Sequence, residues 1–298
     1  MKGPAEEALD PPDWPAWFDG EFQRAGDVTL PARSPWALYG ESVFETLAVV
    51  DAAIEFEAEH AARLGLAAAR VLGCEGQAQI RQAFDAVRAI ALKRAGEPLA
   101  VRVTLANAGG GRLHRLVQAR PLRRMGANPD GIELWVPPGE LAELARGGPG
   151  GCKHGARLGL RMARRAALAA GAFDAAMLGS DGLPACGTVG NLVLLCGGRL
   201  LTPPLSSGAL PGIARGALLA AGELDLRERA PELADWRAIQ GLWLVGSVLG
   251  VAPVVRLGWP AREPDLGEFA PEESLGPRFR DLREALERAV GRSGPLAR

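Results

Sequence analysis

Lysine is rare in this chain: among 34 basic residues only Lys2, Lys93 and Lys153 are lysines, and the others are arginines. A lysine amine that is partly desolvated can lose its proton, and it can then form a Schiff base or act as a base. Arginine stays protonated and is a poor nucleophile. Lys153, in the segment GGPGGCKHGARLG, is therefore a candidate for this chemistry, although composition bias alone can also leave a stray lysine.

Three further segments contain residue types that could bind an anion or react. LPGIARGALLAAGELD (210–225) opens with Pro and Gly and continues as a helix, so the N–H groups of its first turn would point outward, although a plain Pro-Gly turn has the same sequence. NAGGGRLHR (107–115) lacks the GK[ST] of a P-loop and the GxGxxG pattern, which favours a flexible turn. GSVLG around Ser247 lacks the GxSxG spacing of a hydrolase, so Ser247 is more simply a hydroxyl donor in a loop.

The elements that must position these residues follow from apolar periodicity and turn residues. Apolar residues at helical spacing predict helices over 57–73, 80–96, 157–171, 210–225 and 279–290. Short β-rich runs predict strands over 42–51, 52–59, 99–107, 132–137, 175–179, 191–198 and 199–204, and a strand, a turn and a second strand over 241–258. The basic, turn-rich segment ARPLRRMGANPD separates two halves, which predicts a domain of residues 1–126 and another of 127–298 in an α+β (mixed α/β) protein.

Composition and charge exclude several classes of protein. The net charge of −1, with both signs interspersed, leaves no basic stripe for nucleic acid. The acidic, proline-rich start has no apolar signal core and no segment is apolar enough to span a membrane, so we expect a soluble, cytoplasmic protein. Four cysteines without a CxxC pair and three scattered histidines predict reduced thiols and no metal site.

Six motifs occur together in one order over roughly residues 16–257. They are YGESVFETL (39–47), HAARL (60–64), KHGAR (153–157), PACGTVGNLVLL (184–195), LTPPLSSGALPGIAR (201–215) and GSVLGVAPV (246–254). The set resembles the class IV aminotransferase family of pyridoxal-phosphate enzymes, which includes branched-chain and D-amino-acid aminotransferases and aminodeoxychorismate lyase. The resemblance implies a fold-type IV, D-amino-acid-aminotransferase-like enzyme with two α/β domains, the cofactor between them, and assembly as a homodimer.

The resemblance also implies roles for individual residues. Lys153 would form the Schiff base with pyridoxal 5'-phosphate, which explains why arginine does not stand there. Arg63, in HAARL, would bind the cofactor's phosphate, for which a bidentate guanidinium is well suited. The backbone amides of Ile213 and Ala214, at a helix amino end, would bind the same phosphate, and the Ser247 hydroxyl would add a donor.

Within the family, two segments are more similar to aminodeoxychorismate lyase than to the transaminases. These are KHGAR, with Arg157 four residues after the lysine, and VRVTLANAGGGR, which ends in Arg112. The lyase removes pyruvate from 4-amino-4-deoxychorismate to give 4-aminobenzoate for folate synthesis. By this resemblance Lys153 would move the proton, Arg112 and Arg157 would contact carboxylates, and Thr46 would position the substrate. Each of these last three residues is equally consistent with a solvated surface position.

Cys186 departs from the family pattern. The family has a glutamate there, beside the pyridine nitrogen of the cofactor, where a carboxylate keeps the ring protonated and a strong electron sink. A thiol is a weaker partner, because its ordinary pKa is about 8.5 against about 4.3 for glutamate. Two alternatives to the lyase stay open. One is a D- or branched-chain amino-acid aminotransferase, against which Cys186 argues, and the other is a catalytically impaired or cofactor-free member that acts as a binding protein, which Cys186 favours.

Overall fold

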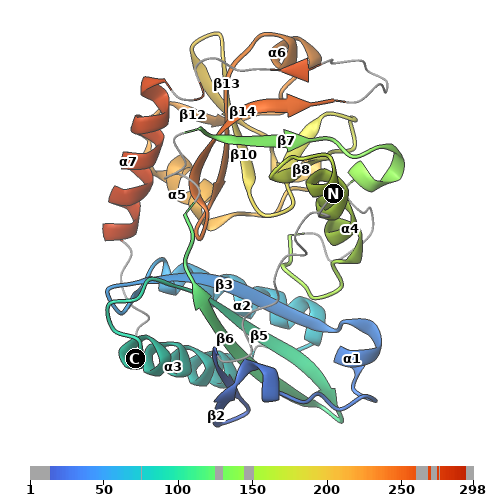
Figure 1. Cartoon of the computed structure of the whole chain (residues 1–298), viewed down its shortest axis with the longest axis vertical. Coiled ribbons are helices and arrows are strands. Elements are labelled where there is room, and N and C mark those ends of the chain that lie inside the picture. Colours follow the sequence, from blue (N-terminus) through green and yellow to red (C-terminus); the bar gives the residue numbers. More distant parts are fainter. Residues whose placement is uncertain are drawn as a thin grey trace. The chain divides into compact units, whose positions relative to one another are not determined.

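The computed structural model of the chain describes residues 14–74, 76–124, 130–143, 151–259, 268–269, 274 and 276–292. These residues form two compact units (Figure 1). The N-terminal unit consists of the described residues up to Arg123 together with Cys152–Arg157, and the C-terminal unit consists of those in Arg124–Gly151 and Leu158–Arg292. The segment that carries Lys153 therefore folds with the N-terminal unit, whereas the sequence division at residue 126 assigns this lysine to the second domain.

The N-terminal unit is built on a six-stranded sheet in the order β2-β1-β6-β5-β3-β4. Its strands are antiparallel, and the long β3, β5 and β6 form the middle of the sheet. The elements are β1 (Pro15–Phe18), β2 (Glu21–Arg24), α1 (Pro35–Tyr39), β3 (Ser42–Val50), β4 (Ala53–Ile54), α2 (Glu57–Leu72), α3 (Gln77–Lys93), β5 (Leu99–Gly109) and β6 (Arg112–Pro121).

Helices α2 and α3 pack on this sheet and close its hydrophobic core (Figure 1). Their buried residues recur at helical spacing, as Leu64, Ala67 and Ala68 do in α2. Helix α2 ends at Leu72, and the next residue, Gly73, has a left-handed backbone (φ +68°) that favours glycine. The apolar face that α2 buries thus determines which of its polar residues lie near β3.

The segment Cys152–Arg157 pairs with the beginning of β3. The N–H of Phe44 donates to the carbonyl of Lys153 at 2.9 Å, and the N–H of Gly155 donates to the carbonyl of Ser42 at 2.7 Å. A Cβ atom at Gly155 would lie 2.1 Å from Oγ of Ser42, so only glycine permits this approach. The backbone on both sides of Lys153 is therefore held against the strand that contains Glu45.

The C-terminal unit is built on a nine-stranded sheet in the order β12-β11-β10-β13-β14-β7-β8-β9, with β15 beside β14. Strand β9 also pairs with β10, which closes the strands from β10 round to β9 into a ring. The elements are β7 (Ile132–Trp135), α4 (Leu158–Ala169), β8 (Asp174–Leu178), β9 (Pro184–Gly187), β10 (Asn191–Cys196), β11 (Arg199–Thr202), α5 (Ile213–Ala221), β12 (Leu226–Glu228), α6 (Leu233–Arg237), β13 (Ile239–Gly246), β14 (Gly250–Gly258), β15 (Glu268–Phe269) and α7 (Pro277–Arg292).

Strand β10, NLVLLC, is buried along its whole length, because the ring has protein on both faces of this strand. Helices α5 and α7 pack against each other, and α5 also contacts β13 (Figure 1). The predicted α+β (mixed α/β) class is confirmed. Over the described residues, no helix combines the length and apolar character needed to cross a membrane.

Candidate active site

Lys153 lies over the ring of Phe44 in the N-terminal unit, with its Nζ 5.0 Å from the ring centroid. Burial of the amine and, second to it, the positive charge of Arg157 lower the pKa of Lys153 to about 7. A substantial share of this amine is therefore neutral at neutral pH, and the neutral amine is the form that acts as nucleophile or base. Lys153 therefore has the partly deprotonated amine that a Schiff base or a catalytic base requires.

Glu45, on β3, forms a buried ion pair with Arg63 on α2. Nε and Nη2 of Arg63 donate to Oε1 and Oε2 of Glu45 at 2.7 and 2.6 Å, a bidentate arrangement. Nδ1 of His60, one turn earlier on α2, lies 2.8 Å from Oε2 of the same carboxylate. Burial would raise the pKa of Glu45, but the hydrogen bonds from His60 and Arg63 outweigh it and lower this pKa to about 2. Arg63 is thereby fixed in one orientation by a charged carboxylate.

Two guanidinium groups lie over the ring of Phe44, in addition to the amine of Lys153. The Cζ atoms of Arg102 and Arg157 lie 3.5 and 5.5 Å from its ring centroid. A cation over the negative face of an aromatic ring is a favourable arrangement. Arg102 is opposite the predicted substrate residue Thr46 in the ladder between β5 and β3, and it shares the ring of Phe44 with the predicted substrate residue Arg157. The positive charges of Arg63 and Arg102 also contribute to the lowered pKa of Lys153.

Arg112, the third predicted substrate residue, has a different position. It is the exposed first residue of β6, at the hairpin that joins β5 to β6. Arg157 thus belongs to the cluster on Phe44 and Thr46 is the cross-strand neighbour of Arg102, whereas Arg112 lies at the end of the hairpin.

Cys186 belongs to the C-terminal unit, where it lies on β9 opposite Met177 of β8 and Asn191 of β10. Its side chain is buried in an apolar cluster that includes Met177 and Ala209.

Ile213 and Ala214 are the first two residues of α5. The preceding residue, Gly212, has no side chain that could accept a hydrogen bond. The N–H groups in the first turn of α5 are therefore not capped by a side chain of Gly212. A helix amino end of this kind favours an anion. Ser247, half-buried, lies in the turn that joins β13 to β14, and its carbonyl accepts from Nη1 of Arg124 at 3.4 Å.

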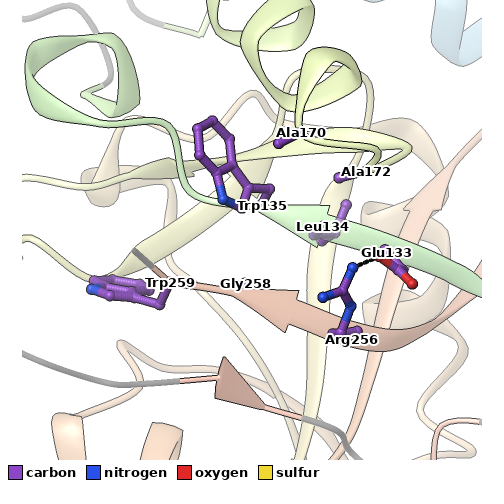
Figure 2. A pocket seen from close by; sticks show the side chains of 8 residues that line it. All are labelled: Glu133, Leu134, Trp135, Ala170, Ala172, Arg256, Gly258 and Trp259. Carbon is purple, nitrogen blue, oxygen red and sulfur yellow. Dashed lines mark hydrogen bonds and ion pairs between the residues drawn. The ribbon is translucent and has the colours of Figure 1, made fainter. Parts of the chain in front are cut away.

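A cavity of about 260 Å³ lies elsewhere in the C-terminal unit (Figure 2). Trp135 and Trp259 line one end of it, and the ion pair of Glu133 with Arg256 lines the other. A second cavity, of about 430 Å³, is lined by Cys196 and neighbouring residues that include three arginines. None of the residues predicted to bind cofactor or substrate lines either cavity.

Sequence reasoning did not single out Glu45, His60 or Arg102. Glu45 and Arg102 interrupt apolar strand runs, and His60 begins the segment HAARL that was selected for its arginine alone. A charged residue inside an otherwise buried run is the available signal, because such a residue needs a partner. The identity of that partner depends on strand and helix packing that the local pattern does not specify.

Comparison with known proteins identifies the family. The family model described as amino-transferase class IV matches residues 42–257. Among solved structures, a fold IV transaminase from Curtobacterium pusillum shares 26% identity with a TM-score of 0.74, covering 90% of this chain and 91% of that one. The Escherichia coli branched-chain amino acid aminotransferase shares 22% identity (TM-score 0.78), covering 92% of this chain and 93% of that one.

A third similar structure is the pyridoxal-phosphate-bound form of a hypothetical aminotransferase from Mycobacterium tuberculosis. It shares 24% identity with a TM-score of 0.76, covering 93% of this chain and 98% of that one. A search of curated protein sequences gives no significant match. The family model spans most of the chain and includes Lys153, Cys186 and the first turn of α5, and the chain therefore belongs to the class IV aminotransferase family of pyridoxal-phosphate-dependent enzymes.

Proposed function

We propose that this chain is a lyase similar to aminodeoxychorismate lyase, which releases pyruvate from 4-amino-4-deoxychorismate and leaves 4-aminobenzoate. The homodimer and the cytoplasmic location expected from the sequence are part of this proposal. When bound, pyridoxal phosphate supplies an electron sink for negative charge on the carbon next to the substrate's amine.

The residues present fit this cofactor. Lys153 offers a buried amine with a pKa of about 7, and Arg63 offers a guanidinium that Glu45 holds in place. We assign the phosphate to Arg63, to the first-turn N–H groups of Ile213 and Ala214, and to the hydroxyl of Ser247.

Lys153 is the candidate for both proton transfers. Its Nζ would accept the proton from the ring carbon that bears the amine and would return a proton to the enolpyruvyl methylene as pyruvate leaves. A pKa near 7 suits both steps, because the group neither holds the proton too firmly nor releases it too readily.

Arg102 and Arg157 are the candidates for carboxylate binding. Both lie over Phe44 together with Lys153, so a carboxylate bound between them would be held close to the amine. Thr46, opposite Arg102 in the sheet, would add a hydroxyl. A substrate with two carboxylates, as the lyase reaction requires, matches this arrangement.

The burial of Cys186 among apolar side chains is the observation that favours the lyase over a transaminase. A thiol in such surroundings would do less than a carboxylate to keep the ring nitrogen of the cofactor protonated. The lyase reaction depends less on the ring, because the product becomes aromatic in that step. We therefore place transamination second.

An aminotransferase acting on branched-chain or D-amino acids is the second candidate, and the structural likeness to branched-chain aminotransferases favours it. A cofactor-free binding protein is the third candidate. The lowered pKa of Lys153 argues against it, because a binding role does not require a deprotonated lysine.

The decisive experiment compares two reactions of the purified protein loaded with pyridoxal phosphate. Pyruvate release from aminodeoxychorismate is measured beside keto-acid formation from a panel of L- and D-amino acids, each also with Lys153→Ala. Pyruvate release that depends on Lys153, with little keto acid, supports the lyase. Keto acid without pyruvate release contradicts it and supports the second candidate. If neither assay shows activity and no visible absorbance band depends on Lys153, the result supports the third candidate, the cofactor-free binding protein.

A further inference from the structure

We propose that Asn191 is a positioning residue that holds the first turn of α5 in place for the cofactor's phosphate. The proposal rests on the proposed use of pyridoxal phosphate. It concerns a residue outside the set predicted to touch the cofactor, and it explains how that set is kept together in the C-terminal unit.

Asn191 stands where three elements of the candidate site meet. It is the first residue of β10, and it is opposite Cys186 on β9 and opposite Val245 on β13. Val245 is two residues before Ser247 in the same chain segment. The backbone of Asn191 therefore connects the strand of the candidate ring-nitrogen partner with the strand that leads to the candidate hydroxyl donor.

The side chain of Asn191 adds the third element, the turn Leu210–Pro211–Gly212 before α5. Its Nδ2 donates to the carbonyl of Leu210 at 2.9 Å, and the N–H of Gly212 donates to the same carbonyl at 2.8 Å. Asn191 is only 5% exposed, so water does not readily replace this hydrogen bond. The amide thus fixes the turn that leads directly into the first turn of the helix.

Gly212 fits against the other end of the same amide. A Cβ atom at Gly212 would lie 1.9 Å from Oδ1 of Asn191, closer than any real contact. The backbone angles of Gly212 (φ −67°, ψ 137°) are open to other residues, so glycine is required here for space and not for conformation. The absence of a side chain at Gly212 also leaves the helix amino end open to an external anion.

This arrangement has a chemical consequence for a phosphate monoester. N–H groups bind a phosphate well only when they converge on it, and an error of about 1 Å in their position costs much of the binding. The sheet register sets Cys186 and Ser247, and the amide of Asn191 sets the helix relative to them. Loss of the amide should therefore weaken the hold on the phosphate more than the hold on the ring.

The test compares two ligands, pyridoxal phosphate and pyridoxal, which differ only in the phosphate. Their affinities are measured from the visible absorbance that depends on Lys153, in the native protein and in Asn191→Ala. We expect the affinity for pyridoxal phosphate to fall about tenfold, the order of one buried hydrogen bond, and the affinity for pyridoxal to stay within about twofold. The ³¹P NMR signal of the bound phosphate should also shift. Asn191→Asp keeps the side-chain volume but loses the donor. It should also lower the affinity for pyridoxal phosphate relative to the affinity for pyridoxal.

Gly212→Ala and the double variant Gly212→Ala/Asn191→Ala test the fit between the two residues. Gly212→Ala should lower the affinity for pyridoxal phosphate, and the double variant should recover part of it, because the clash with Oδ1 is gone. Asn107→Ala is the matched control, since the Asn107 amide also donates to an acceptor, Oε2 of Glu41, but in the N-terminal unit. Asn107→Ala should leave the ratio of the two affinities unchanged.

The outcomes separate this proposal from the proposed function. An absorbance band in the native protein with an equal loss for both ligands, or with no loss, in Asn191→Ala overturns the positioning role alone. A double variant no better than Gly212→Ala overturns the fit between the two residues. A native protein that binds neither ligand through Lys153 overturns the cofactor assignment, and the role of Asn191 with it.

Discussion

The two units present different kinds of polar group at their candidate site residues. In the N-terminal unit these are amine and guanidinium groups: Lys153, Arg102 and Arg157 over Phe44, and Arg63 with its buried carboxylate partner. In the C-terminal unit they are the thiol of Cys186, the hydroxyl of Ser247 and the first-turn N–H groups of α5.

This difference shows two ways to fix an anion-binding group. A charged side chain is long and flexible, so it requires a partner, as Arg63 has in Glu45. A backbone N–H is already fixed by its helix, so only the helix itself must be placed, as Asn191 places α5. Substitutions in the N-terminal unit should therefore change charge and pKa, whereas those in the C-terminal unit should change geometry.

The largest effect is expected for Lys153→Ala. Removal of the amine eliminates the only proposed base, so turnover should fall by at least about 10³-fold. The visible absorbance band of the loaded protein should vanish with it. A steady-state assay measures turnover, and an absorbance spectrum measures the band. Lys93→Ala, an exposed lysine on α3, is the control and should change neither. Retained turnover in Lys153→Ala would show that Lys153 is not the base.

Glu45→Gln should have the next largest effect, on stability. It leaves the Arg63 charge without its carboxylate partner in a buried site, which should lower the free energy of unfolding by about 3 kcal/mol. Urea unfolding measures this difference. The folded pKa of Glu45, about 2, lies below its ordinary value of 4.5, so its stabilising contribution is complete above pH 4.5 and is lost as the pH falls toward 2.

The difference between native protein and Glu45→Gln should therefore shrink below pH 4.5. The pKa of Lys153 should also fall in this variant, because the carboxylate of Glu45 raises it. Asp85→Asn, in an exposed ion pair on α3, is the matched control and should cost less than about 1 kcal/mol. An equal cost at both sites would show that the buried pair has no special role.

Cys186→Glu should shift the reaction rather than abolish it. A carboxylate beside the ring nitrogen makes the cofactor a stronger electron sink, so keto-acid formation should rise about tenfold relative to pyruvate release. Cys186→Ser keeps a neutral group and should leave the ratio unchanged. A ratio unaffected by the carboxylate would mean that Cys186 does not face the ring, and the lyase would lose its main support.

Ser247→Ala should give the smallest effect. One lost hydrogen bond to the phosphate should weaken the binding of pyridoxal phosphate about fivefold and leave turnover at saturation nearly unchanged. Ser180→Ala, an exposed serine of the same unit, provides the baseline. A loss as large as that of Arg63→Ala would contradict the division between the two units, because a neutral donor would then match a charged one.

The sequence was most informative where a local signal existed. Helices α3 and α4 follow apolar spacing, and Lys153 was found because lysine is rare and because the surrounding motif resembles a known family. Strand β6 was not predicted, since its residues RLHRLVQARP mix charged and apolar types and it lies partly exposed. The pattern there is that of a loop, and only its pairing with β5 and β1 makes it a strand.

The partners of the site residues could not be read from the sequence, because they are distant along the chain. Glu45 and Arg63 are 18 residues apart, and the segment of Lys153 joins β3 across more than 100 residues. Such contacts depend on the register of β3 and on the face that α2 buries. The role of Asn191 depends in the same way on two strand pairings and one turn.

The pairing of Cys152–Arg157 with β3 also affects how the chain is made. The N-terminal unit is not complete when Arg123 leaves the ribosome, because 34 more residues, up to Arg157, must follow. At roughly 5–20 residues per second this takes about 2 to 7 seconds, during which the start of β3 has an open edge. During this time the N–H of Phe44 lacks its acceptor, the carbonyl of Lys153, and the carbonyl of Ser42 lacks its donor, the N–H of Gly155. A fragment that ends at Arg123 would keep this open edge permanently, and it would lack the lysine as well.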